Sequence, residues 1–161
     1  MGKLRYLAEQ VPTANDLGLL VLRAVVGVVF VVHGAGDIFD AGVSSNIENY
    51  RDAGIPLPEL AAPFAAYVQF LGGLLLIAGL LSRLVTLGTT VVMIGALIFV
   101  HAGEQIPTGQ DGSGSGFALV MGTASLALLL AGPGRFSLDY LIATKAAGST
   151  PVTTPAIRQD A

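Results

Sequence analysis

Four long apolar stretches divide the chain, separated by polar residues or glycines. The stretches cover residues 17–36, 61–81, 84–101 and 115–132. A hydrocarbon core about 30 Å thick needs roughly 20 helical residues to cross it, with about 17 as a usual lower limit. None of the four alternates between apolar and polar positions, as the strands of a membrane barrel do. The pattern predicts an all-α integral membrane protein, a bundle of four transmembrane helices of which the fourth is short.

The segment between the first two spans, residues 37–60, is long enough to contain structure of its own. Ser45 and Glu48 have the spacing of a capping box, and Gly54 with a proline two residues later is a typical stop signal. We therefore expect a short helix over about 46–53 on the outer side, with Ile47 and Tyr50 on the one face that lies against the membrane surface.

The remaining connections are less regular. The second outer loop, residues 102–114, is rich in glycine and serine, which is typical of a flexible loop. We expect a short interfacial helix over 135–145, followed by residues too polar to form a folded segment. The sequence thus predicts one transmembrane domain, residues 1–145, and a disordered cytoplasmic tail, residues 146–161.

Charged residues are distributed unevenly between the two sides of the predicted bundle. Seven of the eight basic residues fall on the side that holds both termini, and only Arg51 falls on the other side. The two loops on that other side carry seven of the eleven acidic residues. Because lysine and arginine are enriched in the cytoplasmic loops of membrane proteins, we expect both termini in the cytoplasm.

Composition supports a lipid environment and argues against two kinds of function. Of the 161 residues, 53% are hydrophobic and only 12% are charged, whereas a soluble domain usually carries about a quarter charged residues. The net charge of −3 has the wrong sign for a nucleic-acid partner. The sequence contains no cysteine, so it offers neither disulfides nor a thiol for redox chemistry.

Glycines recur at a spacing of seven in three of the spans, which returns them to nearly the same face of a helix. In lipid, helices associate through close packing of small residues rather than through hydrophobicity. We therefore expect these glycines to mark helix–helix seams, although glycine is also common in membrane helices in general. The expected packing glycines are Gly27, Gly34, Gly72, Gly73, Gly79, Gly88, Gly95 and Gly122.

Two polar residues fall well inside the predicted spans. Ionisable groups within a membrane are costly and usually face a bundle interior or an aqueous cavity. Arg23 lies on the glycine face of the first span, so it either has a structural or ligand-binding role or reaches back to the lipid headgroups. Gln69 lies in the outer half of the second span, where its amide either links two helices or binds a polar headgroup.

Two histidines, His33 and His101, fall near the outer ends of the first and third spans. Each has an acid about one turn further on, Asp37 and Glu104 respectively. Such pairs could form a metal site, and two imidazoles could hold a haem, but the sequence has no further histidine or cysteine to complete it. The alternatives are a hydrogen-bonding role, a proton path or contact with a quinone. The candidate intramembrane site residues are Arg23, His33, Gln69 and His101.

A series of short motifs runs through the four spans in a recognisable order. The motifs are Arg23…Gly27…His33-Gly34, then Gly54-Ile55-Pro56-Leu57-Pro58, then Gln69…Gly72-Gly73…Gly79-Leu80…Arg83, and finally Gly132-Pro133-Gly134…Ser137-Leu138-Asp139. No single motif is diagnostic. Their order and spacing, over about residues 19–141, resemble the DoxX family of small bacterial membrane proteins.

The resemblance implies a four-span protein of the bacterial cytoplasmic membrane. Some DoxX-like proteins are linked to thiosulfate:quinone oxidoreductases, and others to membrane assemblies that handle thiol or superoxide stress. The family usually carries Glu where this sequence has Gln69, and many members carry Lys where it has Asp37. These departures weaken the transfer of a carboxylate-dependent or anion-binding role.

Three functions are compatible with these observations. The first is a non-catalytic accessory or scaffold subunit of a membrane redox assembly, because ionisable groups are few and no cofactor motif is present. The second is a quinone-binding subunit of an oxidoreductase that uses Arg23, His33 and Gln69; quinone is the one cofactor that the sequence suggests. The third, a transporter or channel, is less favoured because the two halves of the bundle show no persuasive repeat. Besides lipid, we expect a membrane protein or a second copy as partner.

Overall fold

The computed structural model describes residues 2–106 and 114–148, and within these two ranges it contains helices and connections but no strand. The helices are α1 (Gly2–Ala35), α2 (Val43–Asp52), α3 (Pro58–Ala78), α4 (Ser82–Gly95), α5 (Gly116–Ala131) and α6 (Leu138–Gly148), with single-turn π-helical segments η1 (Gly36–Asp40) and η2 (Ala96–Val100). The predicted all-α fold is confirmed.

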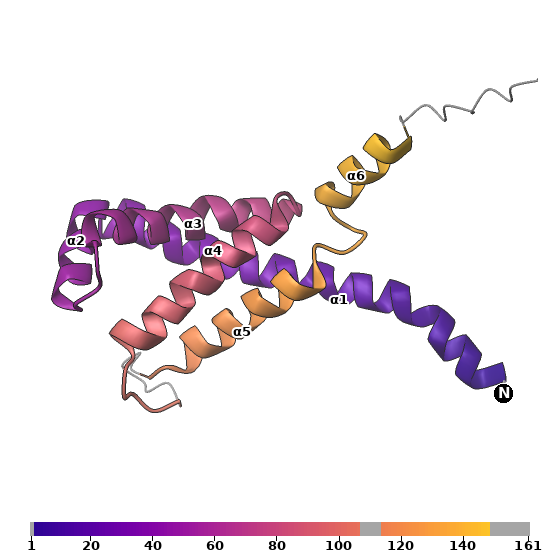
Figure 1. Cartoon of the computed structure of the whole chain (residues 1–161), viewed down its shortest axis with the longest axis horizontal. Coiled ribbons are helices and arrows are strands. Elements are labelled where there is room, and N and C mark those ends of the chain that lie inside the picture. The colour runs from indigo at the N-terminus through magenta and orange to yellow at the C-terminus, as the bar shows by residue number, and fades with distance from the viewer. Residues whose placement is uncertain (1, 107–113, 149–161) are drawn as a thin grey trace, which may run out of the picture.

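Three helical stretches are long and apolar enough to cross a membrane. They are Ala14–Asp40, formed by α1 and η1, then α3, and Ser82–Val100, formed by α4 and η2. The fourth apolar helix, α5, has 16 residues, or about 24 Å at 1.5 Å per residue, and is short for a core of about 30 Å. The first helix differs most from its prediction, because α1 begins at Gly2 and its first part extends beyond the bundle (Figure 1).

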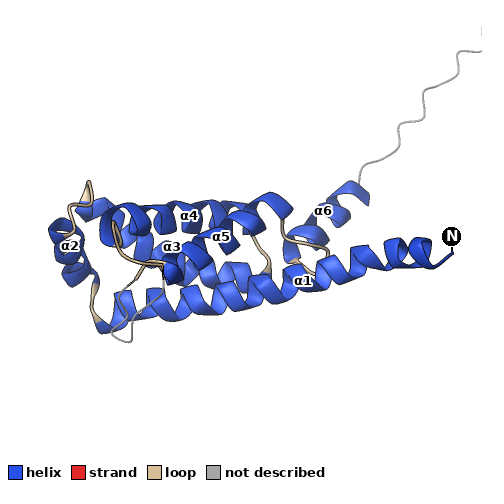
Figure 2. Cartoon of the chain, turned by 90° about the horizontal axis from the view of Figure 1, so that it is seen from below, coloured by secondary structure: helices blue, strands red, loops and turns tan. Residues whose placement is uncertain are grey.

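The four long helices pack as two pairs. Helix α1 lies along α3, helix α4 lies along α5, and α3 also contacts α4 to join the two pairs. Helix α2 packs against α3 at the end of the bundle where α1 passes into η1 (Figure 2). Three residues, 79–81, connect α3 to α4, and such a short connection places consecutive helices antiparallel.

Glycines from both helices form the seam between α1 and α3. A Cβ atom added at Gly27 would lie 2.8 Å from the carbonyl oxygen of Gly73, and one added at Gly73 would lie 2.7 Å from that of Gly27. At Gly34 an added Cβ would meet the backbone of Phe70 and would lie 2.8 Å from the carbonyl oxygen of Ala66. These glycines let the two backbones approach closely, which is how helices associate in lipid.

The other expected packing glycines differ in how closely they approach a neighbouring helix. A Cβ atom added at Gly72, Gly88 or Gly122 would approach a side chain of a neighbouring helix at 3.0 Å. Gly79 follows the last residue of α3 with a φ of 73°, a left-handed conformation that favours glycine. An added Cβ at Gly95 would meet nothing within 4 Å. Gly95 therefore does not mark a helix seam, contrary to expectation; it lines a pocket instead.

Hydroxyl groups link α4 to α5 inside the bundle. Thr86, Thr89 and Ser125 are fully buried, and the Oγ1 atom of Thr89 lies 3.1 Å from the Oγ atom of Ser125. The hydroxyls of Thr86 and Thr89 also donate to carbonyl oxygens one turn earlier in α4. Buried hydroxyls satisfied in this way can connect membrane helices at little cost.

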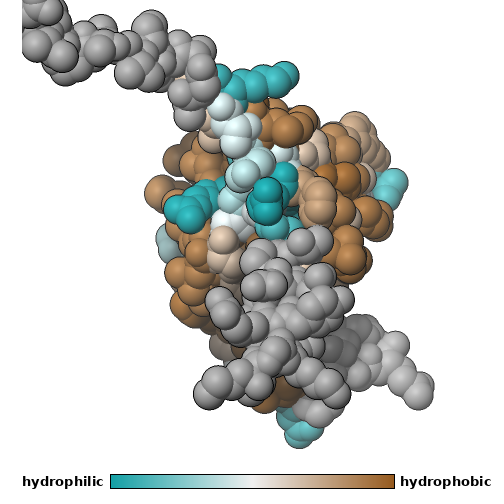
Figure 3. Space-filling model, turned by 90° about the vertical axis from the view of Figure 1, so that its right-hand side faces the viewer, coloured by the Kyte–Doolittle hydropathy of each residue, from teal (hydrophilic) through white to brown (hydrophobic). Residues whose placement is uncertain are grey.

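The outer surface of the bundle is what a lipid environment requires. Large hydrophobic side chains are exposed along every long helix, among them Val32 on α1, Leu71 on α3, Leu84 on α4 and Leu130 on α5. Viewed from the end where α6 lies, hydrophobic residues cover the sides and hydrophilic residues gather toward the viewer (Figure 3). This distribution, with the apolar lengths of the helices, is that of a multi-pass membrane protein.

The short helix expected in the first outer loop is present, but its start was predicted wrongly. Helix α2 begins at Val43 after Gly42, which has a φ of 83°, and no side chain caps it. The proposed capping box at Ser45 and Glu48 therefore lies within the first two turns rather than at the boundary. Sequence spacing suggested the box, but the left-handed glycine ends the preceding segment three residues earlier.

Helix α6 was also predicted with a shifted boundary. It begins at Leu138 rather than at position 135, because Ser137 stands at its start and accepts a hydrogen bond from the backbone N–H of Tyr140 at 3.1 Å. Most of the predicted tail, residues 149–161, and the middle of the second outer loop, residues 107–113, lie outside the described residues.

Candidate functional site

A pocket of about 310 Å³ lies at the α2 end of the bundle. Its polar lining residues come from five places in the chain: His33 in α1, Asp37 in η1, Tyr50 in α2, Gln69 in α3 and His101 after η2. Most of its other walls are apolar. Small-molecule sites typically have this size, with apolar walls and a few polar groups. The structure thus brings together three of the four candidate residues, leaving out Arg23.

Gln69 is the most deeply buried polar group of the pocket. Its side chain is 3% exposed, and its Oε1 atom has no hydrogen-bond partner among the described residues. An unsatisfied buried acceptor costs about 1–3 kcal/mol, so such groups are rare in folded proteins and call for a reason. This oxygen therefore makes no hydrogen bond to another helix, although linking two helices was one of the two roles expected for Gln69.

His101 is held at the pocket by an acid from the same loop. Its Nδ1 atom lies 2.7 Å from the Oε2 atom of Glu104, and the same oxygen accepts a hydrogen bond from the backbone N–H of Gly114 at 2.8 Å. A proton on Nδ1 would leave Nε2 of His101 as an acceptor. Glu104 thereby fixes both the ring and the closure of the second outer loop.

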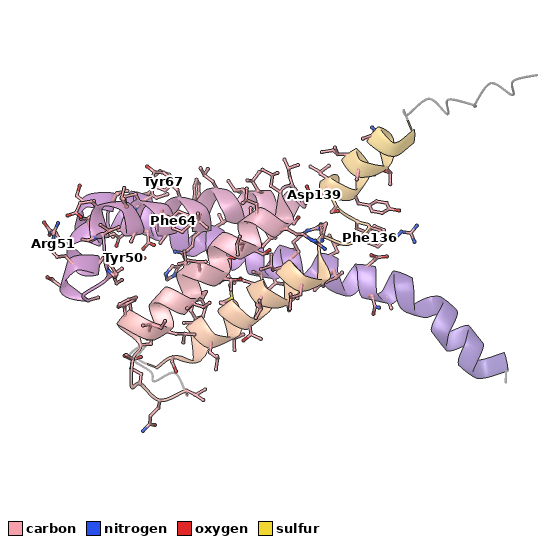
Figure 4. All side chains as sticks on the ribbon, viewed as in Figure 1. Tyr50, Arg51, Phe64, Tyr67, Phe136 and Asp139 are labelled. Atoms are coloured by element: carbon pink, nitrogen blue, oxygen red, sulfur yellow. The ribbon has the colours of Figure 1, made fainter. Side chains whose placement is uncertain are left out.

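Tyr50 contributes a hydroxyl from α2, and Figure 4 shows it near the same end of the bundle as Phe64. Burial, and then the negative charge of nearby Asp37, raise the pKa of Tyr50 above its ordinary value of 10.0. The phenol therefore remains protonated at neutral pH and can donate a hydrogen bond. The pocket accordingly presents a donor at Tyr50 and an unpaired acceptor at Gln69.

His33 lies at the edge of the pocket. It is exposed, and its ring centroid lies 6.1 Å from that of Phe117 in α5. The pairing of histidines with acids proposed from sequence holds for His101 and Glu104. Among the described residues, no three histidine, aspartate or glutamate side chains come together as metal ligands, so His33, Asp37, His101 and Glu104 do not form the metal site considered from the sequence.

Comparison with known proteins identifies the family. The DoxX family model matches residues 18–102, which is more than half of the chain. The chain belongs to the DoxX family. A second model, described as the TQO small subunit DoxD, matches residues 63–154 of this DoxX protein.

The DoxX protein also resembles a curated bacterial protein. It is 33% identical over 85 residues to a Bacillus subtilis (strain 168) protein named "Putative oxidoreductase CatD", which covers 53% of this chain and 60% of CatD. The alignment therefore spans less than two thirds of that relative. No solved structure gives a significant match.

Arg23 of the DoxX protein lies away from the pocket, in contact with the connection between α5 and α6, residues 132–137. Its side chain is 1% exposed. Its Nη1 atom donates to the carbonyl oxygen of Pro133 at 2.5 Å, and its Nη2 atom donates to that of Phe136 at 2.7 Å. Of the alternatives left open by the sequence, these contacts fit a structural role, since the guanidinium is directed at backbone rather than at headgroups.

Asp139 is a structural residue that sequence reasoning missed. Its Oδ1 and Oδ2 atoms accept hydrogen bonds from the backbone N–H groups of Leu81 and Ser82 at 2.8 and 2.9 Å. Its own N–H donates to the carbonyl oxygen of Gly79 at 2.9 Å. Asp139 was noted only as part of the closing family motif, because nothing local in the sequence connects it to a turn almost 60 residues earlier.

Tyr50 is the pocket residue that the sequence signalled least clearly. The predicted helix over 46–53 placed it on one face together with Ile47, but that face was expected to meet the membrane surface. The structure turns Tyr50 into the pocket, while Asn46 is buried and donates to the carbonyl oxygen of Asp37 at 2.9 Å. This hydrogen bond ties α2 to η1 and sets the direction of Tyr50.

Proposed function

We propose that this DoxX protein is a membrane subunit of a redox assembly and that its pocket binds the headgroup of a quinone. The observation that carries the proposal is the unpaired Oε1 atom of Gln69, 3% exposed in a pocket of about 310 Å³. A quinol hydroxyl could donate to this oxygen, and the Tyr50 phenol could donate to a quinone carbonyl.

The relatives support a redox setting for this site. One matching family is described as a small subunit, and the similar Bacillus protein carries the name of an oxidoreductase. In the proposed assembly the redox centre of a larger partner supplies two electrons, and two protons taken from water complete the reduction of quinone to quinol. His33, which is exposed, and the half-buried Asp37 line the pocket and could pass such protons to it. This chain would hold and orient the quinone without supplying a redox centre itself.

A binding measurement tests the quinone site. The full-length protein in lipid nanodiscs would be dialysed against menadione, a naphthoquinone without a side chain, with empty nanodiscs as the reference. We expect saturable binding that weakens about tenfold in Gln69→Leu, since losing one hydrogen bond of roughly 1.4 kcal/mol changes affinity by that factor. The control Thr123→Val replaces an exposed hydroxyl of α5 that bonds only within its own helix. Binding no greater than that of empty nanodiscs would refute the site.

The proposal also requires a defined orientation in the bacterial cytoplasmic membrane. The distribution of basic residues supports cytoplasmic termini and a pocket that faces the outer side. Because the sequence contains no cysteine, single cysteines can report on each side. In intact cells, an impermeant maleimide should label Ala53→Cys in the connection after α2 and should spare Lys145→Cys in α6 until the cells are opened. The reverse pattern would place the pocket in the cytoplasm.

A scaffold role is the second candidate, and one observation favours it. Helix α6 and the connection before it expose large hydrophobic side chains, with Phe136 at 51%, Leu141 at 51% and Ile142 at 57%. A partner subunit could cover this surface. Purification in mild detergent should then retain a redox protein in fixed stoichiometry, and Leu141→Glu together with Ile142→Glu should release it. Retention of the partner by this double variant would count against α6 as the contact.

A further inference from the structure

A second hollow lies on the outside of the bundle, along the seam between α3 and α4. It has a volume of about 590 Å³, and every residue that lines it is hydrophobic or glycine. Its α3 side runs from Phe64 to Leu75, about 17 Å at 1.5 Å per residue. A hollow of this shape and chemistry fits a hydrocarbon chain lying roughly along the helices.

Two glycines create the space in this groove. A Cβ atom added at Gly88 would lie 3.0 Å from Cγ1 of Val68 and 3.9 Å from Cζ of Phe64. One added at Gly72 would lie 3.0 Å from Cγ1 of Val85. Both positions line the groove, so a larger residue at either one would reduce its depth.

The groove adjoins the polar pocket. Phe64 in α3 and Val91 in α4 line both hollows, and both side chains are about half exposed on the bundle surface. A molecule with its polar end near Gln69 could therefore extend past Phe64 into the groove without leaving the protein surface. Because these two shared residues lie in α3 and α4, the seam between these helices is the natural direction of entry from lipid.

The lining of the pocket limits the kind of headgroup. None of the residues lining the pocket is lysine or arginine, and Asp37 adds a negative charge. The anionic headgroup of a phospholipid would find no lysine or arginine there, and basic pockets are the usual lipid-binding sites of membrane proteins. An uncharged ring with oxygen substituents avoids this penalty and can use both Tyr50 and Gln69.

We infer that the groove between α3 and α4 holds the isoprenoid chain of a quinone whose ring occupies the pocket, and that the quinone enters sideways from the bilayer. This inference rests on the proposed quinone site and specifies its ligand as a long-chain quinone. Packing in the groove, rather than transfer out of water, provides the added contacts, because the chain leaves an equally apolar lipid environment.

Photo-crosslinking with two probes tests the inference. One naphthoquinone probe carries an azide on its ring, and the other carries a diazirine at the end of an isoprenoid chain of four units. Both are applied to the full-length protein in nanodiscs, with and without excess menaquinone-4, and the labelled peptides are mapped by mass spectrometry. We expect competed ring labelling at the pocket and competed chain labelling on α3 and α4 along the groove.

Two variants narrow the groove in different ways. Gly88→Leu fills its floor, and Leu71→Trp fills it from a residue that is 51% exposed and so does not disturb the helix seam. Each should lose the chain labelling of the groove and keep the ring labelling of the pocket. The control Ala127→Leu enlarges an exposed residue of α5 and should change neither.

The outcomes separate the two proposals. Competed ring labelling with chain labelling spread over the lipid faces of α1 and α5, insensitive to menaquinone-4, would overturn the groove and leave the quinone site standing. Chain labelling of the groove that persists in both Gly88→Leu and Leu71→Trp would also overturn it. If menaquinone-4 competes with neither probe at any position, both the groove and the quinone site are wrong.

Discussion

The carboxylate of Asp139, at the start of α6, accepts a hydrogen bond from the backbone N–H of Ser82, the first residue of α4, at 2.9 Å. The residue before α4, Leu81, has the left-handed φ of 51°, and its N–H donates to the other oxygen of the same carboxylate. The first N–H groups of a helix lack partners within it, and a carboxylate there also interacts favourably with the helix dipole. A residue from α6 therefore caps α4.

Asp139→Ala should destabilise the protein by about 1–2 kcal/mol, the usual effect of removing a helix N-cap. Asp139→Asn retains one acceptor oxygen, so its stability should lie between that of the alanine variant and that of the native protein. Thermal unfolding in detergent measures both effects. Equal stability of all three proteins would show that the start of α4 does not depend on this cap.

Arg23→Met should destabilise the protein more than Asp139→Ala does. The Arg23 side chain is 1% exposed and donates to the carbonyl oxygens of Pro133 and Phe136. Removing a buried charged donor from two partly buried carbonyl acceptors should cost about 3 kcal/mol. Arg23→Lys keeps the charge with one compact donor group and should recover part of the loss. The folded fraction of each variant should bind menadione as the native protein does, since Arg23 does not line the pocket. A specific loss of quinone binding would restore a ligand role for Arg23.

The contrast between Arg23 and the four spans shows what sequence can predict in this protein. The long apolar helices follow from local hydrophobicity, which a window of about 20 residues detects. The partners of Arg23 lie 110 and 113 residues away, and they are backbone carbonyls, which every residue possesses. Periodicity placed Arg23 on the glycine face but contained no information about which carbonyls it would meet.

The pocket was predictable only in part for a related reason. The depths of His33, Gln69 and His101 along their spans placed all three toward the outer side, and the structure gathers them around one pocket. Whether Gln69 has a hydrogen-bond partner depends on the side chains opposite it, which periodicity along one helix does not determine. The direction of the Tyr50 side chain depends on the orientation of α2, which is set by the contact of Asn46 with Asp37. A pattern along the sequence does not contain this contact.

Gly34→Ala should weaken the pairing of α1 with α3. An added Cβ would lie 2.8 Å from the carbonyl oxygen of Ala66, and relieving such a contact requires the two backbones to separate, at a cost of about 1–3 kcal/mol. Gly18→Ala is the matched control in the same helix, because an added Cβ there meets nothing within 4 Å. That change should be neutral or stabilise by up to about 1 kcal/mol through helix propensity. Thermal unfolding in detergent distinguishes them, and equal effects would contradict the close approach of α1 to α3.

Gln69→Leu should raise the stability of the ligand-free protein while it weakens quinone binding. The Oε1 atom is buried without a partner, and replacing an unsatisfied acceptor by an apolar group of similar size should recover about 1–3 kcal/mol. Thr89→Val provides the contrast, because the Thr89 hydroxyl is bonded to Ser125 and its removal should destabilise. A lower unfolding temperature for Gln69→Leu would instead assign Gln69 the role of a link between helices.

Tyr50 should make the protein less stable at alkaline pH. Its pKa in the folded state lies above 10.0, raised first by burial and then by Asp37. Below about pH 10 the phenol is neutral in both states, and the stability that this shift contributes is fully present. As the pH rises through that range the unfolded state ionises first, so stability declines until the pH passes the folded pKa.

Thermal unfolding measured between about pH 8 and pH 11 should show a steeper decline in stability for the native protein than for Tyr50→Phe. Asp37→Asn should reduce the difference only in part, because burial is the larger cause. A native profile that coincides with that of Tyr50→Phe would mean that the hydroxyl is solvated and not enclosed in the pocket.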